Sequence, residues 1–140
     1  MKNFLLVDDS LDWIETIESF IENIAEDLDF TDYKIVRAFN AHEALRRLEE
    51  LDTVAMVFLD SEMKFNANGI DFLNGLNAMI DKNPAIKESK AQLILLNSAY
   101  TEKNKDLLAT GLISEVLQKN GDYIYDRLET LLSEINIKAA

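Results

Sequence analysis

The sequence predicts an α/β protein in which helices cover both faces of a parallel sheet. The main observation is an apolar run, Val54–Leu59, that ends directly in Asp60. A run this short and rich in valine is typical of a strand that is buried on both faces. A second apolar run, Phe4–Val7, also ends in acid, at Asp8 and Asp9. Segments with helical spacing separate such runs along the chain, which is the alternation expected of this fold class.

Composition favours one domain over residues 1–140, and we expect no effector domain, because 140 residues with 48% hydrophobic content leave little room for a second core. The net charge of -12 argues against direct binding to nucleic acid or to an anionic membrane, and suits divalent cations or basic protein partners. The chain has no cysteine and no run of signal-peptide or membrane-spanning length. We therefore expect a soluble protein of the cytoplasm.

The first half of the chain contains three predicted strands and two predicted helices. Ser10 or Asp9 can cap the helix that follows Phe4–Val7, and its core-facing stripe is Ile14, Ile17, Ile21, Ile24 and Leu28. Tyr33–Phe39 alternates as a half-exposed edge strand does. Asn40 and Glu43 resemble a capping box, and the helix after them has the apolar positions Ala41, Ala44, Leu45, Leu48 and Leu51. The third strand is the run that ends in Asp60.

The second half continues the alternation with helix, strand, helix, strand and helix. The spacing predicts a third helix from Ile70 that ends before Pro84, because proline disfavours helix at the preceding residue. Strands are expected at Leu93–Leu96 and Val116–Leu117, with a helix from Thr101 to about Thr110 between them. Asp122 is the predicted cap of a last helix, whose apolar face is Ile124, Leu128, Leu131, Leu132 and Ile135.

Five strands and five helices joined by right-handed crossovers fit the flavodoxin-like, doubly wound strand order 2-1-3-4-5. This order places the first and third strands side by side. Asp8, Asp9 and Asp60 then meet at the edge formed by the carboxyl ends of the strands, where such sheets bind ligands. Three neighbouring carboxylates repel one another, and a hard divalent cation removes that conflict. Mg²⁺ is the expected ion, because it takes oxygen ligands and works with phosphates.

Further polar groups are expected at the same edge. The backbone carbonyl of Glu62 can be a fourth metal ligand, while Ser98 follows the fourth strand and Lys119 follows the fifth. Together these groups suit a phosphoryl site in which the metal and Lys119 neutralise charge, Ser98 donates a hydrogen bond and a central carboxylate attacks. Taken singly, each has a plainer interpretation: a solvated helix start at Asp8 and Asp9, a turn at Ser98, and a surface charge at Lys119.

These residues resemble the receiver domain of two-component response regulators over essentially the whole chain. The matching stretches are Leu6-Val7-Asp8-Asp9, Asn40-Ala41-His42-Glu43-Ala44-Leu45, Phe58-Leu59-Asp60 with Met63, Gly69-Ile70-Asp71-Phe72-Leu73, Leu96-Asn97-Ser98-Ala99 and Lys119. The resemblance implies that Asp60 accepts a phosphoryl group from a sensor histidine kinase or a histidine phosphotransfer protein. It implies Mg²⁺ on Asp9, Asp60 and the Glu62 carbonyl, with Asp8 acting through water, and Ser98 and Lys119 on the phosphoryl oxygens. It also implies no enzymatic activity beyond the domain's own phosphorylation and dephosphorylation, and output through an unidentified protein partner.

Three positions depart from the family pattern. Lys64 and Asn120 stand where proline usually follows Met63 and Lys119, and Val116 replaces an aromatic residue. The phosphorylation residues are intact, but coupling between the serine and that aromatic residue is altered. A receiver-fold protein-binding module that acts independently of phosphorylation is therefore the alternative.

Two other classes are weaker. An aspartate-nucleophile phosphatase of the haloacid dehalogenase type would have a second Asp where this chain has Glu62, and commonly a cap domain. A flavodoxin is disfavoured because Asp8-Asp9-Ser10 would repel a flavin phosphate.

Overall fold

A computed structural model of the chain describes residues 2–51, 53–60, 92–97, 114–118 and 120–139. Within them lies a five-stranded sheet of order β2-β1-β3-β4-β5, and every neighbouring pair is parallel. The strands are β1 (Lys2–Val7), β2 (Tyr33–Ala38), β3 (Met56–Asp60), β4 (Gln92–Asn97) and β5 (Glu115–Gln118). The predicted α/β class and strand order are confirmed.

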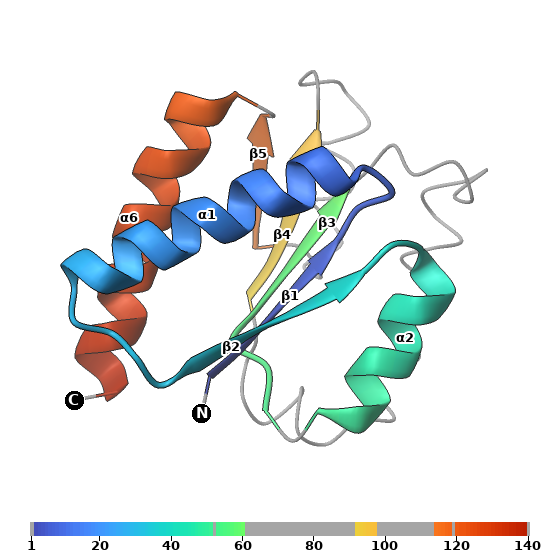
Figure 1. Cartoon of the computed structure of the whole chain (residues 1–140), viewed down its shortest axis with the longest axis horizontal. Coiled ribbons are helices and arrows are strands. Elements are labelled where there is room, and N and C mark those ends of the chain that lie inside the picture. The colour runs from blue at the N-terminus through green and yellow to red at the C-terminus, as the bar shows by residue number, and fades with distance from the viewer. Residues whose placement is uncertain (1, 52, 61–91, 98–113, 119, 140) are drawn as a thin grey trace.

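The described helices are α1 (Leu11–Asp27), α2 (Ala41–Glu50) and α6 (Gly121–Ala139). Helices α1 and α6 lie together on one face of the sheet and α2 lies on the other (Figure 1). The third and fourth predicted helices fall outside the described residues. None of the described helices is both long and apolar enough to cross a membrane.

The two central strands bury side chains on both faces, which explains their continuous apolar runs. Alternate residues of β1 and β3 pair in register and join the core beneath α1 and α6; these are Phe4, Leu6, Met56 and Phe58. The intervening residues are equally buried and point to the opposite face; these are Leu5, Val7, Val57 and Leu59. Burial on both faces is the expected environment of a central parallel strand.

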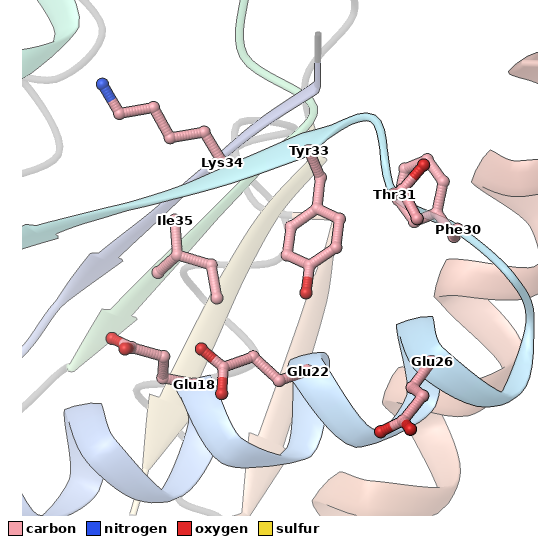
Figure 2. Close-up of a pocket in the computed structure, with 8 residues that line it drawn as sticks. All are labelled: Glu18, Glu22, Glu26, Phe30, Thr31, Tyr33, Lys34 and Ile35. Atoms are coloured by element: carbon pink, nitrogen blue, oxygen red, sulfur yellow. The ribbon is translucent and has the colours of Figure 1, made fainter.

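Strand β2 is the outer strand of the sheet, as its mixed sequence predicted. Lys34 is exposed, Tyr33 and Ile35 are half-buried, and only Ala38 is fully buried. A groove opens between this strand and α1, and Figure 2 shows the side chains that line it.

Helix α1 begins after Ser10, whose hydroxyl oxygen accepts the Trp13 N–H at 3.4 Å. The predicted isoleucine stripe is buried, and Leu28 is half-buried just beyond the helix. The end of the helix is a Schellman motif, in which the Phe30 N–H donates to the Ala25 carbonyl at 2.8 Å. Asp29 makes the turn with a φ of 53°, a left-handed conformation that glycine adopts most readily.

The beginnings of the other two described helices were predicted with different success. The Asn40 side-chain oxygen accepts the Glu43 N–H at 2.8 Å, so the predicted cap of α2 is confirmed. The prediction that Asp122 caps the last helix is wrong. Helix α6 begins at Gly121, and the Asn120 side-chain oxygen accepts the Tyr123 N–H at 3.3 Å. Asp122 lies inside the first turn, where its negative charge suits the helix dipole.

The buried faces of these two helices match the predicted positions in the main. On α2, Ala44 and Leu48 are buried, while Leu45 and the following Leu51 are half-buried. On α6, all the predicted apolar positions are buried; these are Ile124, Leu128, Leu131, Leu132 and Ile135.

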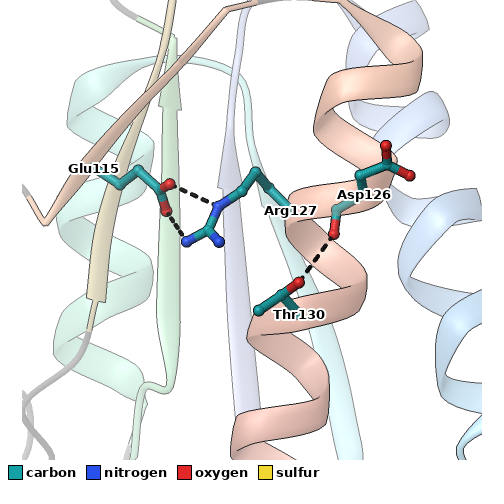
Figure 3. Close-up of polar contacts among 4 residues, drawn as sticks. All are labelled: Glu115, Asp126, Arg127 and Thr130. Atoms are coloured by element: carbon teal, nitrogen blue, oxygen red, sulfur yellow. Dashed lines mark hydrogen bonds and ion pairs between the residues drawn. The ribbon is translucent and has the colours of Figure 1, made fainter.

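A two-point ion pair ties α6 to β5. The Arg127 Nε donates to one carboxylate oxygen of Glu115 at 2.7 Å and its Nη2 donates to the other at 3.0 Å (Figure 3). This hydrogen bonding raises the pKa of the Arg127 guanidinium. In the same view, the Thr130 hydroxyl donates to the Asp126 carbonyl within the helix at 3.4 Å. The pair therefore joins the two elements on either side of Lys119 in the sequence.

Replacing Asp29 with glycine should stabilise the fold. The left-handed turn would lose its Cβ penalty and the carboxyl end of α1 would lose an unfavourable negative charge. We expect Asp29→Gly to raise the free energy of unfolding by about 0.5–1 kcal/mol and the melting temperature by roughly 3 °C. Asp29→Asn, which removes only the charge, should give less than half of that gain. A lower melting temperature for Asp29→Gly would contradict the assignment.

Replacing the Arg127 guanidinium should weaken the ion pair between α6 and β5. Arg127→Lys keeps the charge but cannot make both bonds to Glu115, so we expect a loss of less than about 1 kcal/mol, since the pair is partly solvent-exposed. Urea denaturation measures the difference. Arg46→Lys, on an exposed position of α2, is the matched control and should leave stability unchanged. Equal changes in the free energy of unfolding for the two substitutions would show that the two-point ion pair of Arg127 does not stabilise the fold.

Candidate functional site

Three carboxylates meet where β1 and β3 end. Asp8 and Asp9 directly follow β1, and Asp60 is the last residue of β3. One carboxylate oxygen from each of the three lies within 4.8 Å of the other two. The two strands are parallel neighbours, so their carboxyl ends reach the same edge of the sheet. The structure thus brings together the three acids, as the predicted topology required, and we call them the acid cluster.

Backbone hydrogen bonds position Asp8 within this cluster. Its N–H donates to the Ala38 carbonyl at 3.1 Å, which extends the pairing of β1 with β2 by one residue. Its Oδ1 accepts the Ser10 N–H at 2.9 Å. Ser10 in turn caps α1, so a single turn links the end of β1, the carboxylate and the start of the helix. An aspartate that accepts an N–H two residues ahead is a common turn device.

Burial separates the three acids into two kinds. Asp8 and Asp60 are 2% and 3% exposed, whereas Asp9 is exposed. Burying carboxylates is costly unless opposite charge or hydrogen bonds compensate them. The cluster offers oxygen donors from three side chains, one of them open to solvent, and such a donor set has the chemistry of a hard-cation site. The donor set fits Mg²⁺, which binds oxygen ligands and keeps several waters.

The remaining predicted site residues, Glu62, Ser98 and Lys119, lie outside the described residues, so their positions stay predictions. The described strands lead up to two of them. Asn97 ends β4 and Gln118 ends β5, and these two residues are paired in register. Ser98 and Lys119 are the next residues in the chain after each.

Two features of this region were not recognised from the sequence. Ser10 was expected only as a possible helix cap, but its N–H also holds Asp8; the spacing Asp8-Asp9-Ser10 is the signal that could have identified this turn. Asn120 was noted only as a departure from proline, yet its side chain caps α6. The asparagine therefore has a structural role that proline, without an amide side chain, could not perform.

No protein-family model matches the sequence, and no curated protein matches it. Several solved structures have the same fold at low identity. The signal receiver domain of a DNA-binding response regulator from Colwellia psychrerythraea 34H has a TM-score of 0.72 and 20% identity, covering 96% of this chain and 98% of that one. A response regulator receiver domain protein from Methanospirillum hungatei JF-1 has a TM-score of 0.68 and 17% identity, covering 100% and 99%. A two-component response regulator from Clostridium difficile has a TM-score of 0.69 and 14% identity, covering 97% and 99%.

These neighbours match almost the whole of both chains. The sheet order of this chain places the acid cluster at the edge where open α/β sheets bind ligands. The chain therefore has the fold of a response regulator receiver domain.

Proposed function

We propose that this chain is the phosphoacceptor receiver of a two-component phosphorelay and that it signals through contacts with a partner protein. The observation that carries the proposal is the acid cluster, in which one oxygen of each carboxylate lies within 4.8 Å of the other two in a receiver fold. We assign residues 1–140 to one receiver domain. Asp60 is assigned as the acceptor, because it ends the buried central strand and lies with two further carboxylates.

We assign Mg²⁺ binding to Asp8, Asp9, Asp60 and the backbone carbonyl of Glu62. Bound there, the ion would neutralise charge on the carboxylates and on the transferring phosphoryl group. Asp9 is exposed and can bind directly, while Asp8 already accepts the Ser10 N–H and is given the supporting role through water. Asp60 would then keep one oxygen for the metal and one for phosphorus.

The transfer uses the Asp60 carboxylate as a nucleophile. One of its oxygens attacks the phosphorus of a phosphohistidine on a sensor histidine kinase or a histidine phosphotransfer protein. A P–O bond forms as the P–N bond breaks, and the departing imidazole takes up a proton. In the proposal, the Ser98 hydroxyl donates to a phosphoryl oxygen and the Lys119 ammonium pairs with another. Water later attacks the phosphorus, which releases inorganic phosphate and restores the carboxylate. In this proposal the chain catalyses only its own phosphorylation and dephosphorylation.

A second function is a protein-binding module of receiver fold that acts without phosphorylation. One observation favours it: Val116, at the family's aromatic position, is half-buried in β5 and has no ring to report the state of Ser98. This function requires a partner whose affinity is the same for wild type and Asp60→Ala, with or without a phosphodonor.

Removing one carboxylate should relieve repulsion in the metal-free protein. In EDTA we expect Asp60→Asn to be more stable than wild type by about 1–2 kcal/mol, because one of three clustered charges is gone. Mg²⁺ should stabilise the wild type, by about 2.7 kcal/mol at one hundred times its Kd, and leave the variant nearly unchanged. Thermal denaturation followed by circular dichroism measures both effects. Asp126→Asn, on an exposed position of α6, is the control and should behave as wild type. Equal responses to Mg²⁺ in wild type and Asp60→Asn would contradict the metal assignment.

Phosphorylation is tested directly with Mg²⁺ and phosphoramidate, followed by intact-mass spectrometry. The wild type should gain the mass of one phosphoryl group, while Asp60→Asn should gain none. Asp9→Asn should be labelled at least about tenfold more slowly, because the direct metal ligand is lost. An established receiver treated in parallel confirms that the phosphodonor is active. Labelling that survives Asp60→Asn, or an unlabelled wild type beside a labelled control, would overturn the proposal.

A further inference from the structure

A groove of about 560 Å³ runs between α1 and the outer strand β2. Figure 2 shows glutamates of α1 along one side and apolar side chains of the β2 region along the other. We call this space the β2 groove; its acidic side is Glu18, Glu22 and Glu26, and its apolar side is Phe30, Tyr33 and Ile35. The groove begins beside Tyr33, the first residue of β2, whereas Asp60 is the last residue of β3. The parallel strands therefore place the groove towards their amino ends, away from the acid cluster.

The acidic side of the groove has a regular spacing. Glu18, Glu22 and Glu26 are four residues apart on α1, so they share one helix face at intervals of about 6 Å. At one end, Glu18 is paired with Arg37 of β2 at 2.7 Å. Glu22 and Glu26 are exposed, and within the described part of the chain neither has an ion-pair partner. Glu22 and Glu26 therefore add two negative charges beside a groove whose lining also includes Lys34. The hydrogen bond with Glu18 raises the pKa of the Arg37 guanidinium most, and the charges of Glu15 and then Glu22 raise it further.

The apolar side is built by aromatic stacking. The rings of Phe30 and Tyr33 stack with centroids 5.4 Å apart, and Ile35 continues the surface along β2. Burial, and then the charge of Glu22, raises the pKa of the Tyr33 hydroxyl. Phe30 is buried in the core, so the half-buried Tyr33 and Ile35 supply the apolar contact, opposite a row of carboxylates.

The outer edge of β2 offers backbone hydrogen bonds. The Asp32 and Ala38 carbonyls accept the N–H groups of Lys2 and Asp8, so the even-numbered residues turn their peptide groups towards β1. The odd-numbered residues Tyr33, Ile35 and Arg37 therefore turn theirs outward. Among the strands that the structure describes, none pairs with this edge.

We propose that the β2 groove binds an extended, basic segment of a partner protein, which adds to the sheet as a strand beside β2. Alternate residues of an extended segment are about 6.6 Å apart, which matches the spacing of the glutamates. Lysine or arginine at alternate positions would face Glu22 and Glu26 across the groove. The backbone of the segment would pair with the outward peptide groups of β2, the general mode of strand addition at a sheet edge.

Charge decides the kind of partner. A second copy of this chain would bring its own acidic helix face and a net charge of -12, so it would be repelled. Nucleic acid is excluded for the same reason. A basic protein segment has the opposite charge and also a backbone that can use the strand edge. Because the acid cluster lies at the other end of the strands, this binding does not depend on the proposed phosphorylation.

The test uses a fluorescein-labelled synthetic peptide of alternating lysine and valine, titrated with the full chain and followed by fluorescence anisotropy. We expect saturable binding that weakens as salt is added. Glu22→Lys with Glu26→Lys should raise the Kd at least about tenfold, because two attractions become repulsions. Glu129→Lys with Glu134→Lys makes the same change of net charge on exposed positions of α6 and should stay within about twofold of wild type. Circular dichroism confirms that both variants are folded.

A second arm tests the added strand without altering the protein. Two peptides carry N-methyl groups on alternate residues, one set on the odd and one on the even positions. The N–H groups of only one set point towards β2, and methylation removes those hydrogen-bond donors. The peptide methylated on that set should therefore bind at least about tenfold more weakly, and the other should bind as the unmethylated peptide does. The proposal would be overturned if the two methylated peptides bound equally or if no saturable binding were observed. It would also be overturned if the variant pair in α1 and the control pair in α6 lost the same affinity for the peptide. Self-association that disappears in Glu22→Lys with Glu26→Lys would also overturn it, by assigning the groove to a second copy.

Discussion

The parallel pairing of β1 with β3 is the interaction on which the rest of the structure depends. Its register runs from Phe4 beside Met56 to Val7 beside Leu59. Side chains buried on both faces hold this register, because a slip by one residue would turn every one of them to the wrong face. The acids that follow the two strands are therefore brought together by the burial of their apolar neighbours, against their mutual repulsion.

This arrangement explains why a charged cluster can persist in an acidic protein. Asp8 and Asp9 are part of a turn that also continues the sheet and leads into α1: the Asp8 N–H donates to the Ala38 carbonyl, its carboxylate accepts the Ser10 N–H, and Ser10 caps the helix. Moving the carboxylates apart would break these backbone contacts. The fold thus supplies the stability, and the cluster supplies a site where added positive charge is favourable. Metal binding and phosphoryl transfer are functions that use such a site.

In the described part of the chain, the acid cluster and the β2 groove lie towards opposite ends of the strands, and their charges are arranged differently. At the carboxyl ends, two buried carboxylates and one exposed carboxylate lie close together, which suits a small cation and one reacting group. Near the amino ends, the glutamates of α1 form a row beside an open strand edge, which suits an extended chain. Charges that meet at one point favour binding of a metal ion and reaction of a single group, whereas charges repeated along a strand edge favour binding of an extended peptide segment. The proposed phosphoacceptor function would use the first region and the proposed partner segment would bind at the second.

The sequence by itself determined the strands, the buried helix faces and the meeting of Asp8, Asp9 and Asp60. These follow from hydrophobic periodicity, which is local, and from the few topologies open to alternating strands and helices. Tertiary structure decided that Asn120, and not Asp122, caps α6. It also decided that buried Asn3 donates to the Thr53 carbonyl at 2.8 Å, fifty residues away, and that a groove separates α1 from β2. Such contacts depend on how whole elements pack, and no local pattern of residues encodes that geometry.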